Sequence, residues 1–94
     1  MNYTDIPLVN NETSHNFELI VDGQRSFIDY KVKGDKIYLI HTEVPEVLQG
    51  QGVAEVLVEK AFNYIEEQKI KIVPLCAYVQ VFLKRHPEWD KLIA

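Results

Sequence analysis

The spacing of apolar residues changes once along this chain, and that change limits the folds it can adopt. Over residues 17–21 and 28–32 every second residue is apolar, which is the period of a strand with one buried face. Beyond the loop 45–50 the apolar residues recur every three or four positions, as they do on one face of a helix. The sequence therefore predicts a group of strands followed by a helix that packs against them.

Three strands are expected before the loop. Turn signals, Asp-Gly at 22–23 and Gly-Asp at 34–35, separate the runs of alternating residues. Tight turns of this kind join neighbouring antiparallel strands, so the three strands form a meander. The third run, 36–44, is apolar on both faces, which predicts a central strand covered on both sides.

The second half of the chain predicts a helix, a strand and a helix. The amphipathic stretch Gly52–Gln68 is the first helix, and the β-branched run 70–75 is a fourth strand. A helix between two strands implies a right-handed crossover and parallel pairing. Residues 76–85 form the second helix, which Pro87 ends, and the apolar residues of 89–93 predict a tail that docks. The expected fold is an α/β (α+β) sandwich in the order β-β-β-α-β-α, with a mixed, mostly antiparallel sheet and one splayed parallel pair.

Length and composition indicate one globular domain. The 94 residues are 47% hydrophobic and 26% charged, so we expect a single domain over 1–94, with 1–16 a loosely ordered arm that includes a short strand near 6–9. The lone cysteine excludes an internal disulfide, and the three histidines share no ligand spacing, so no metal site is predicted.

Charge and hydropathy narrow the partners. No apolar run is long enough to span a membrane and no secretory signal is visible, so a cytoplasmic monomer is the default expectation. The net charge of −4 and the scattered lysines argue against nucleic acid and against anionic membrane surfaces. A small anion remains a possible ligand if local backbone dipoles hold it.

The segment after the third strand carries the strongest functional signal. Two glycines before a helix let backbone N–H groups face a ligand, and the first helical turn adds unpaired donors and a partial positive charge. The combination suits a pyrophosphate. No Lys-Ser/Thr pair follows, so this is not a Walker loop, and a plain strand-to-helix turn is the alternative. The residues of this segment are Gln49, Gly50, Gln51, Gly52, Val53 and Ala54.

Pro74 predicts where the parallel pairing ends. Proline has no N–H, so ladder pairing on that side stops there and a slot opens between the third and fourth strands. An edge-strand proline with no ligand is the alternative interpretation.

Cys76 follows at the predicted start of the last helix, where the helix dipole favours a thiolate. A buried packing role for this cysteine is the alternative.

Segment 49–54 resembles the Gln/Arg-x-x-Gly-x-Gly/Ala signature of the GNAT superfamily, the acetyl-CoA-dependent N-acetyltransferases. Three further stretches, His-Thr-Glu-Val-Pro at 41–45, Pro-Leu-Cys-Ala-Tyr-Val at 74–79 and Arg-His-Pro-Glu-Trp at 85–89, resemble a minimal GNAT-like subfamily of about this length. The resemblance covers residues 17–92, nearly the whole chain.

The resemblance implies acetyl-CoA as the cofactor and an acyl-CoA as the small-molecule partner. The backbone around Val44 would pair with the pantetheine arm, and segment 49–54 would hold the pyrophosphate. Independently of the resemblance, Lys84 and Arg85 at the end of the last helix are candidates for a phosphate contact, with a solvated basic pair at a helix C-terminus as the alternative. The chain has no room for the N-terminal helices that shape the acceptor site in larger members, so the acceptor stays unspecified. Phe82 is the aromatic residue nearest the position where many members place a tyrosine as general acid.

Four residues are candidates for catalysis. Cys76 could take the acetyl group from a thioester to give an acyl-enzyme. His41 and Glu43 follow the inward alternation of their strand, so either is a candidate general base, with a hydrogen-bonded core histidine as the alternative for His41. Tyr78 could donate to the thioester carbonyl, or simply be buried. The expected function is an acetyltransferase; a non-catalytic acyl-CoA binding module is the alternative, and a small interaction domain that has lost the cofactor is a third.

Overall fold

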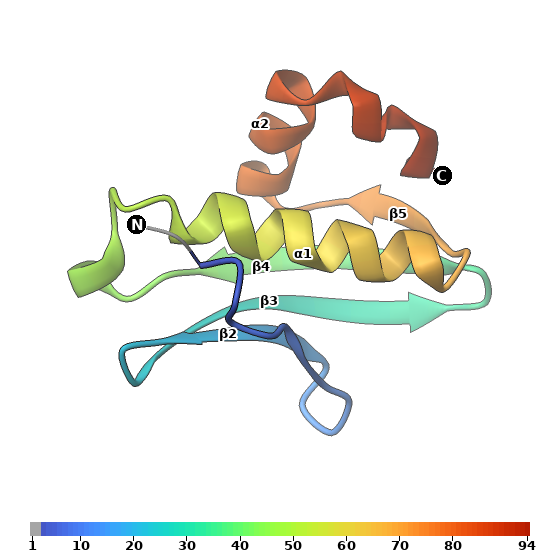
Figure 1. Cartoon of the computed structure of the whole chain (residues 1–94). Coiled ribbons are helices and arrows are strands. Elements are labelled where there is room, and N and C mark those ends of the chain that lie inside the picture. Colours follow the sequence, from blue (N-terminus) through green and yellow to red (C-terminus); the bar gives the residue numbers. More distant parts are fainter. Residues whose placement is uncertain (1–2) are drawn as a thin grey trace.

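The computed structural model describes residues 3–94 and has the predicted order of main elements, preceded by one short strand in the N-terminal segment (Figure 1). Two short 3-10 helices are also present, η1 (Glu46–Leu48) before the first α-helix and η2 (Pro87–Leu92) after the second. The strands are β1 (Val9–Asn11), β2 (Asn16–Val21), β3 (Gln24–Lys33), β4 (Lys36–Glu43) and β5 (Lys71–Pro74), and the helices are α1 (Val53–Glu67) and α2 (Ala77–Arg85).

One mixed sheet contains the described strands, in the order β1-β2-β3-β4-β5. The first four pair antiparallel, and β4 pairs parallel with β5. The β2–β3 turn places Asp22 and Gly23 at positive φ (51° and 75°), which is why an Asp-Gly pair suits it. The predicted meander and its single parallel pair are confirmed.

The N-terminal segment makes more contacts with the rest of the protein than the loosely ordered arm that we expected. The predicted strand at 6–9 lies instead at β1, which pairs with β2. Tyr3 is 3% exposed, and its hydroxyl donates to the Gln51 carbonyl at 3.1 Å, 48 residues away. Lys60 Nζ donates to the Thr4 carbonyl at 3.1 Å. These contacts tie the segment across α1 (Figure 1), while residues 1 and 2 lie outside the described part.

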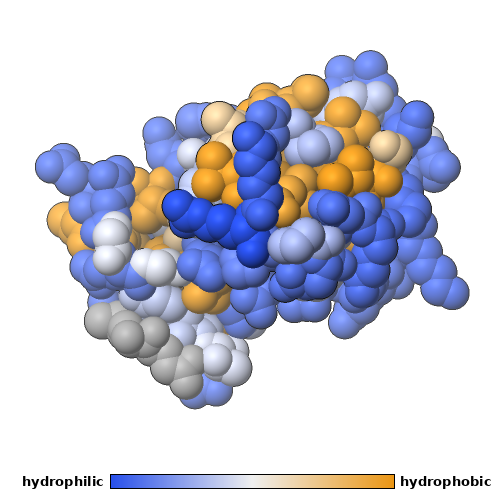
Figure 2. Space-filling model, turned by 90° about the horizontal axis from the view of Figure 1, so that it is seen from above, coloured by the Kyte–Doolittle hydropathy of each residue, from blue (hydrophilic) through white to orange (hydrophobic). Residues whose placement is uncertain are grey.

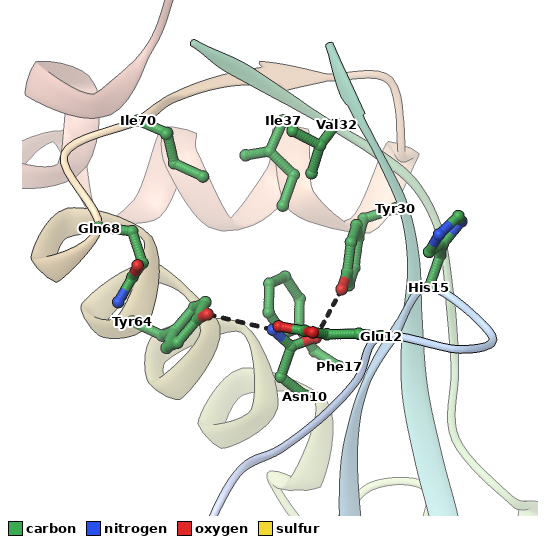
Figure 3. A pocket seen from close by; sticks show the side chains of 10 residues that line it. All are labelled: Asn10, Glu12, His15, Phe17, Tyr30, Val32, Ile37, Tyr64, Gln68 and Ile70. Atoms are coloured by element: carbon green, nitrogen blue, oxygen red, sulfur yellow. Dashed lines mark hydrogen bonds between the residues drawn. The ribbon is translucent and has the colours of Figure 1, made fainter. Parts of the chain in front are cut away.

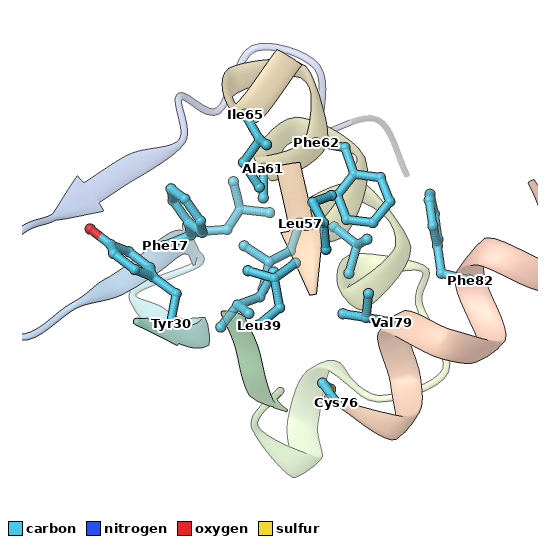
Figure 4. Packing of buried hydrophobic residues seen from close by; sticks show 14 of the residues in the cluster. Phe17, Tyr30, Leu39, Leu57, Ala61, Phe62, Ile65, Cys76, Val79 and Phe82 are labelled. Atoms are coloured by element: carbon cyan, nitrogen blue, oxygen red, sulfur yellow. The ribbon is translucent and has the colours of Figure 1, made fainter. Parts of the chain in front are cut away.

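The core lies between one face of the sheet and both helices (Figure 4). Phe62 of α1 is fully buried and meets Phe82 of α2 and Trp89 of η2 edge to face, with ring centroids 5.3 Å and 5.5 Å apart. Ile93 forms a parallel bridge with Ile72 of β5, so the tail docks as predicted. Aromatic packing therefore joins α1 to α2 and η2.

A β-bulge at Ile40 changes which side chains of β4 face the core. Leu39 is opposite Tyr30, but His41 is opposite the preceding residue, Asp29, so Ile40 has no partner on β3. The extra residue moves the inward position from 41 to 42, and Thr42 shares a face with the buried Ile28. The alternation predicted for the strand holds before the bulge and reverses after it.

Two expectations for β4 are wrong, the first of them because of the bulge. His41 and Glu43 do not face inward: their side chains are 58% and 62% exposed, with His41 Nε2 3.9 Å from Glu43 Oε1. The strand is also not covered on both sides, since α1 and α2 pack on the same face and Ile40 is 45% exposed. The face opposite the helices, called the open face below, is instead rich in charge, with Arg25 paired to Glu18 at 2.6 Å.

Apolar surface remains on the side of the molecule where α2 and η2 lie (Figure 2). Leu75, Val81 and Ile93 are 57%, 42% and 39% exposed.

Among residues 3–94 no helix is long and apolar enough to cross a membrane. The same residues contain no group of three or more His, Cys, Asp or Glu side chains placed to hold a metal ion.

Candidate functional site

The parallel strands stop pairing at Pro74, as the sequence predicts. The last register pair is Leu39 with Pro74, and the next two N–H groups, of Leu75 and Cys76, both donate to the Leu39 carbonyl at 3.0 Å and 2.9 Å. Strand β4 continues to Glu43, whereas the chain after Pro74 turns into α2. Within the described part of the chain, the last residues of β4 thus have no β5 partner.

A side-chain contact spans the gap where the two strands separate. Thr42 Oγ1 lies 3.2 Å from Cys76 Sγ, and either atom can be the donor. Cys76 is the N-cap residue of α2, as predicted, and is 5% exposed within the core. Sequence reasoning missed Thr42 because its inward position depends on the bulge, which an apolar Ile40 does not reveal.

The glycine segment forms an uncapped helix start. Gly50 and Gly52 have φ of 79° and 80°, the left-handed region that favours glycine. Gly52 is the N-cap of α1, no side chain caps the helix, and the Val56 N–H closes the first turn on the Gly52 carbonyl at 3.2 Å. The first N–H groups of such a helix have no intrahelical partner and attract anions.

A cavity of about 230 Å³ joins this helix start to the end of β4. It combines backbone donors from the glycine segment with apolar walls from Val44, which directly follows β4, from η1 and from α1. Of the predicted residues, Gln51, Arg85, Cys76, His41 and Glu43 are not among those that line it. The lining residues are Val44, Leu48, Gln49, Gly50, Gly52, Val53, Ala54, Glu55 and Tyr78.

Side chains of the loop hold its shape in the free protein. Gln49 Nε2 donates to the Val44 carbonyl at 3.1 Å, and Gln51 Nε2 donates to the Val47 carbonyl at 3.0 Å. The buried Tyr3 hydroxyl donates to the Gln51 carbonyl from outside the loop. These bonds order the loop before any ligand arrives, which lowers the entropy that binding must remove.

The end of α2 lies against the start of α1. His86 Nε2 is 3.4 Å from Glu55 Oε1. Arg85 lines a small hollow together with Glu55 and Tyr78, beside the cavity at the start of α1. Burial and the Glu55 carboxylate raise the pKa of Tyr78, and Arg85 partly opposes them. The Tyr78 hydroxyl therefore keeps its proton at neutral pH and can donate a hydrogen bond.

Comparisons with known proteins place the chain in a family. The family model of the GCN5-related N-acetyl-transferase matches residues 16–92. The chain belongs to the GCN5-related N-acetyltransferase (GNAT) family. The resemblance indicated by segment 49–54 and its neighbouring stretches is thus confirmed.

Relatives and a solved structure agree with this family. Protein NATD1 from Xenopus tropicalis is 34% identical over 64 residues, which cover 67% of this chain and 59% of that protein. Protein NATD1 from Danio rerio is 32% identical over 74 residues, covering 76% and 67%. The chain thus spans less than two thirds of the length of the frog relative. A GCN5-like protein from Staphylococcus aureus solved by NMR has a TM-score of 0.72 at 22% identity, over 97% of this chain and 90% of that one, and shows the same fold.

Proposed function

We propose that this GNAT protein binds acetyl-CoA across the cavity between β4 and α1. The observation that carries the proposal is the single cavity that joins the uncapped glycine helix start to Val44 and Tyr78. The pyrophosphate lies on the N–H groups of segment 49–54. The pantetheine arm follows the end of β4, where the strand has no β5 partner. On binding, the arm replaces the Gln49 amide at the Val44 backbone.

The proposed reaction is acetyl transfer, by way of Cys76. The Cys76 thiolate attacks the thioester carbonyl, a new bond forms between carbon and Sγ, and the bond from carbon to the sulfur of CoA breaks. CoA leaves as a thiolate and takes up a proton, so no oxidant or reductant is needed. Tyr78, still protonated, donates to the carbonyl oxygen as negative charge develops. Because Cys76 contacts Thr42 and does not line the cavity, that contact must open first.

His41 and Glu43 stay candidates for the general base, and their exposed side chains restrict what they can serve. From their position, they can deprotonate only an acceptor that approaches the sheet from the open face.

A non-catalytic acyl-CoA binding module is the second candidate. The observation that favours it is the burial of the proposed nucleophile, Cys76, and of Phe82, which lies nearest the position of the usual general acid. Cys76 is 5% exposed and Phe82 is 3% exposed. Phe82 packs its ring on Phe62 and carries no hydroxyl, so it cannot act as the usual acid. In this case the protein binds acetyl-CoA without acquiring an acetyl group.

Gly52→Ala is expected to weaken acetyl-CoA binding at least tenfold in a folded protein. An added Cβ at Gly52 points into open space in the free protein, and the proposed pyrophosphate position fills that space in the complex. The positive φ adds about 1–2 kcal/mol of backbone strain. Calorimetric titration with acetyl-CoA measures the affinity.

Gly34→Ala is the matched control for this strain. Gly34 has φ of 62° and equally open space around its Cβ, but it lies in the β3–β4 turn away from the cavity. It should lose similar stability and bind acetyl-CoA like the parent. Equal affinities for the Gly52→Ala and Gly34→Ala variants would refute the proposed pyrophosphate position.

Arg85→Ala is expected to lower the affinity for acetyl-CoA by a factor of about three at low salt, because an exposed charge contributes less than about 1 kcal/mol. Arg85 is next to the Glu55 and Tyr78 side chains that line the cavity. The effect should shrink in 0.5 M salt, where the screening length falls to about 4 Å. Lys84→Ala is the control, since Lys84 is the other basic residue of the last turn of α2. Equal binding by both variants at low salt would show that Arg85 makes no phosphate contact.

A further inference from the structure

A second hollow, of about 330 Å³, lies at the other end of α1 (Figure 3). Its walls come from β1, β2, β3, the start of β4, the last turns of α1 and the segment before β5. Tyr64 of α1 lines it, twelve residues beyond Gly52, which at 1.5 Å per residue is roughly 18 Å along the helix. The hollow is thus separate from the cavity proposed for acetyl-CoA.

A polar cluster crosses the floor of this hollow. The Tyr30 hydroxyl donates to Asn10 Oδ1 at 2.5 Å, and Asn10 Nδ2 donates to the Tyr64 hydroxyl at 3.1 Å. In Figure 3 the two phenol rings stand on either side of Asn10. The bonds connect β1, β3 and α1, so the aromatic walls keep their positions without a ligand. A preformed site of this kind is typical of small-molecule pockets.

The walls present aromatic rings on several sides. The Phe17 ring centroid is 4.6 Å from that of Tyr30 and 5.6 Å from that of Tyr64, and His15 lies 5.9 Å from Tyr30. Ile37 adds a buried aliphatic surface. Ring faces of this kind attract cations, and the apolar surface between them suits a hydrocarbon or aromatic body.

The charged side chains of the hollow favour a cation. Glu12 is the only carboxylate among the lining residues, none of them is a lysine or arginine, and the one imidazole, of His15, lies against the Tyr30 ring. Four lysines follow lining residues in the sequence without lining the hollow themselves: Lys31, Lys33, Lys69 and Lys71. Two of them are engaged elsewhere, since Lys33 Nζ lies 5.8 Å from the Tyr38 ring centroid and Lys71 Nζ donates to the Lys91 carbonyl at 2.7 Å. A cation therefore finds a carboxylate here and no lysine or arginine in the lining.

We propose that this hollow binds a small organic cation, an ammonium group attached to an apolar or aromatic body. The ammonium group lies between the Glu12 carboxylate and the faces of Tyr30 and Tyr64, and the body fills the space against Ile37. The proposal does not depend on acetyl-CoA binding in the other cavity. Acetyl-CoA itself is not expected in this hollow, because the Glu12 carboxylate would repel its phosphates.

The test uses three probes that differ mainly in charge: phenethylamine, 2-phenylethanol and 3-phenylpropanoate, each added to ¹⁵N-labelled protein at pH 7. Phenethylamine should shift the side-chain amides of Asn10 and Gln68 and the backbone amides of Tyr30 and Tyr64, and leave Gly50 and Gly52 unchanged. It should bind at least fivefold more tightly than the alcohol or the acid. No saturable shift up to 10 mM amine, or equal binding of the alcohol or the acid, would overturn the proposal.

Variants separate this site from the proposed acetyl-CoA site. Glu12→Gln removes the negative charge from an exposed side chain and should weaken amine binding about fivefold, as expected for one exposed ion pair. Glu59→Gln, an equal change in charge on an exposed position of α1 outside the hollow, should leave it unchanged. Both variants should bind acetyl-CoA like the parent, so failure at one site is distinguishable from failure at the other. Equal amine binding by the two variants would contradict the role of Glu12.

Discussion

Replacing Phe62 with alanine is expected to lower the free energy of unfolding by about 3–5 kcal/mol. The ring is fully buried and packs edge to face on both Phe82 and Trp89. Its removal leaves a cavity between α1, α2 and η2 that a close-packed core refills only in part. Since small domains are stable by about 5–15 kcal/mol, the variant should be close to unfolding. Urea denaturation followed by circular dichroism measures the change.

Phe27→Ala is the control for loss of an aromatic ring. Phe27 lies on the open face, half-buried, with the Arg25 guanidinium 4.2 Å from its ring centroid. Its removal should cost less, because water already reaches the ring and little cavity forms. A Phe62→Ala loss no larger than that of Phe27→Ala would contradict the role assigned to Phe62 in joining the two helices.

Cys76→Ser is expected to abolish a covalent acetyl adduct that the parent protein acquires from acetyl-CoA. The parent should gain one acetyl group, detected by intact mass and removed by hydroxylamine, which cleaves thioesters. The reaction should be slow at neutral pH and faster at mildly alkaline pH, because the thiolate is the nucleophile and a free thiol has a pKa of about 8.5. The serine variant should keep its affinity for acetyl-CoA.

The outcome of this labelling separates the two functions proposed above. An adduct on the parent and none on the serine variant supports acetyl transfer by way of Cys76. A parent that binds acetyl-CoA yet acquires no adduct at alkaline pH would show that Cys76 only packs in the core, beside Thr42. The non-catalytic binding module would then be the better account.

The order of the main elements could be predicted because each depends on local signals. Period-two runs gave the strands, and helical spacing gave α1 over nearly its full length. Pro74, which lacks an N–H, marked the end of the parallel pairing. The residues that line the cavity proposed for acetyl-CoA were also predictable where they belong to the glycine segment, since glycines before a helix leave its first N–H groups free for an anion.

Features that depend on long-range pairing were not predictable from the sequence. The bulge at Ile40 turns His41 outward and Thr42 inward, and an apolar residue at the bulge fits either alternation. Tyr3 looked like part of a loose arm, because its bond to Gln51 joins residues 48 positions apart. The hollow around Asn10 assembles from five elements, so no single stretch of sequence marks it.

Titration of ¹⁵N-labelled protein with acetyl-CoA, followed by backbone amide shifts, tests the central claim most directly. We expect saturable shifts centred on Val44 and on Gly50 to Ala54, with smaller changes at Tyr78, since these residues line the proposed cavity. CoA without the acetyl group should give nearly the same pattern, because the nucleotide and the pantetheine arm make most of the contacts. Saturable shifts centred elsewhere, or no saturable shift at millimolar acetyl-CoA, would contradict the account.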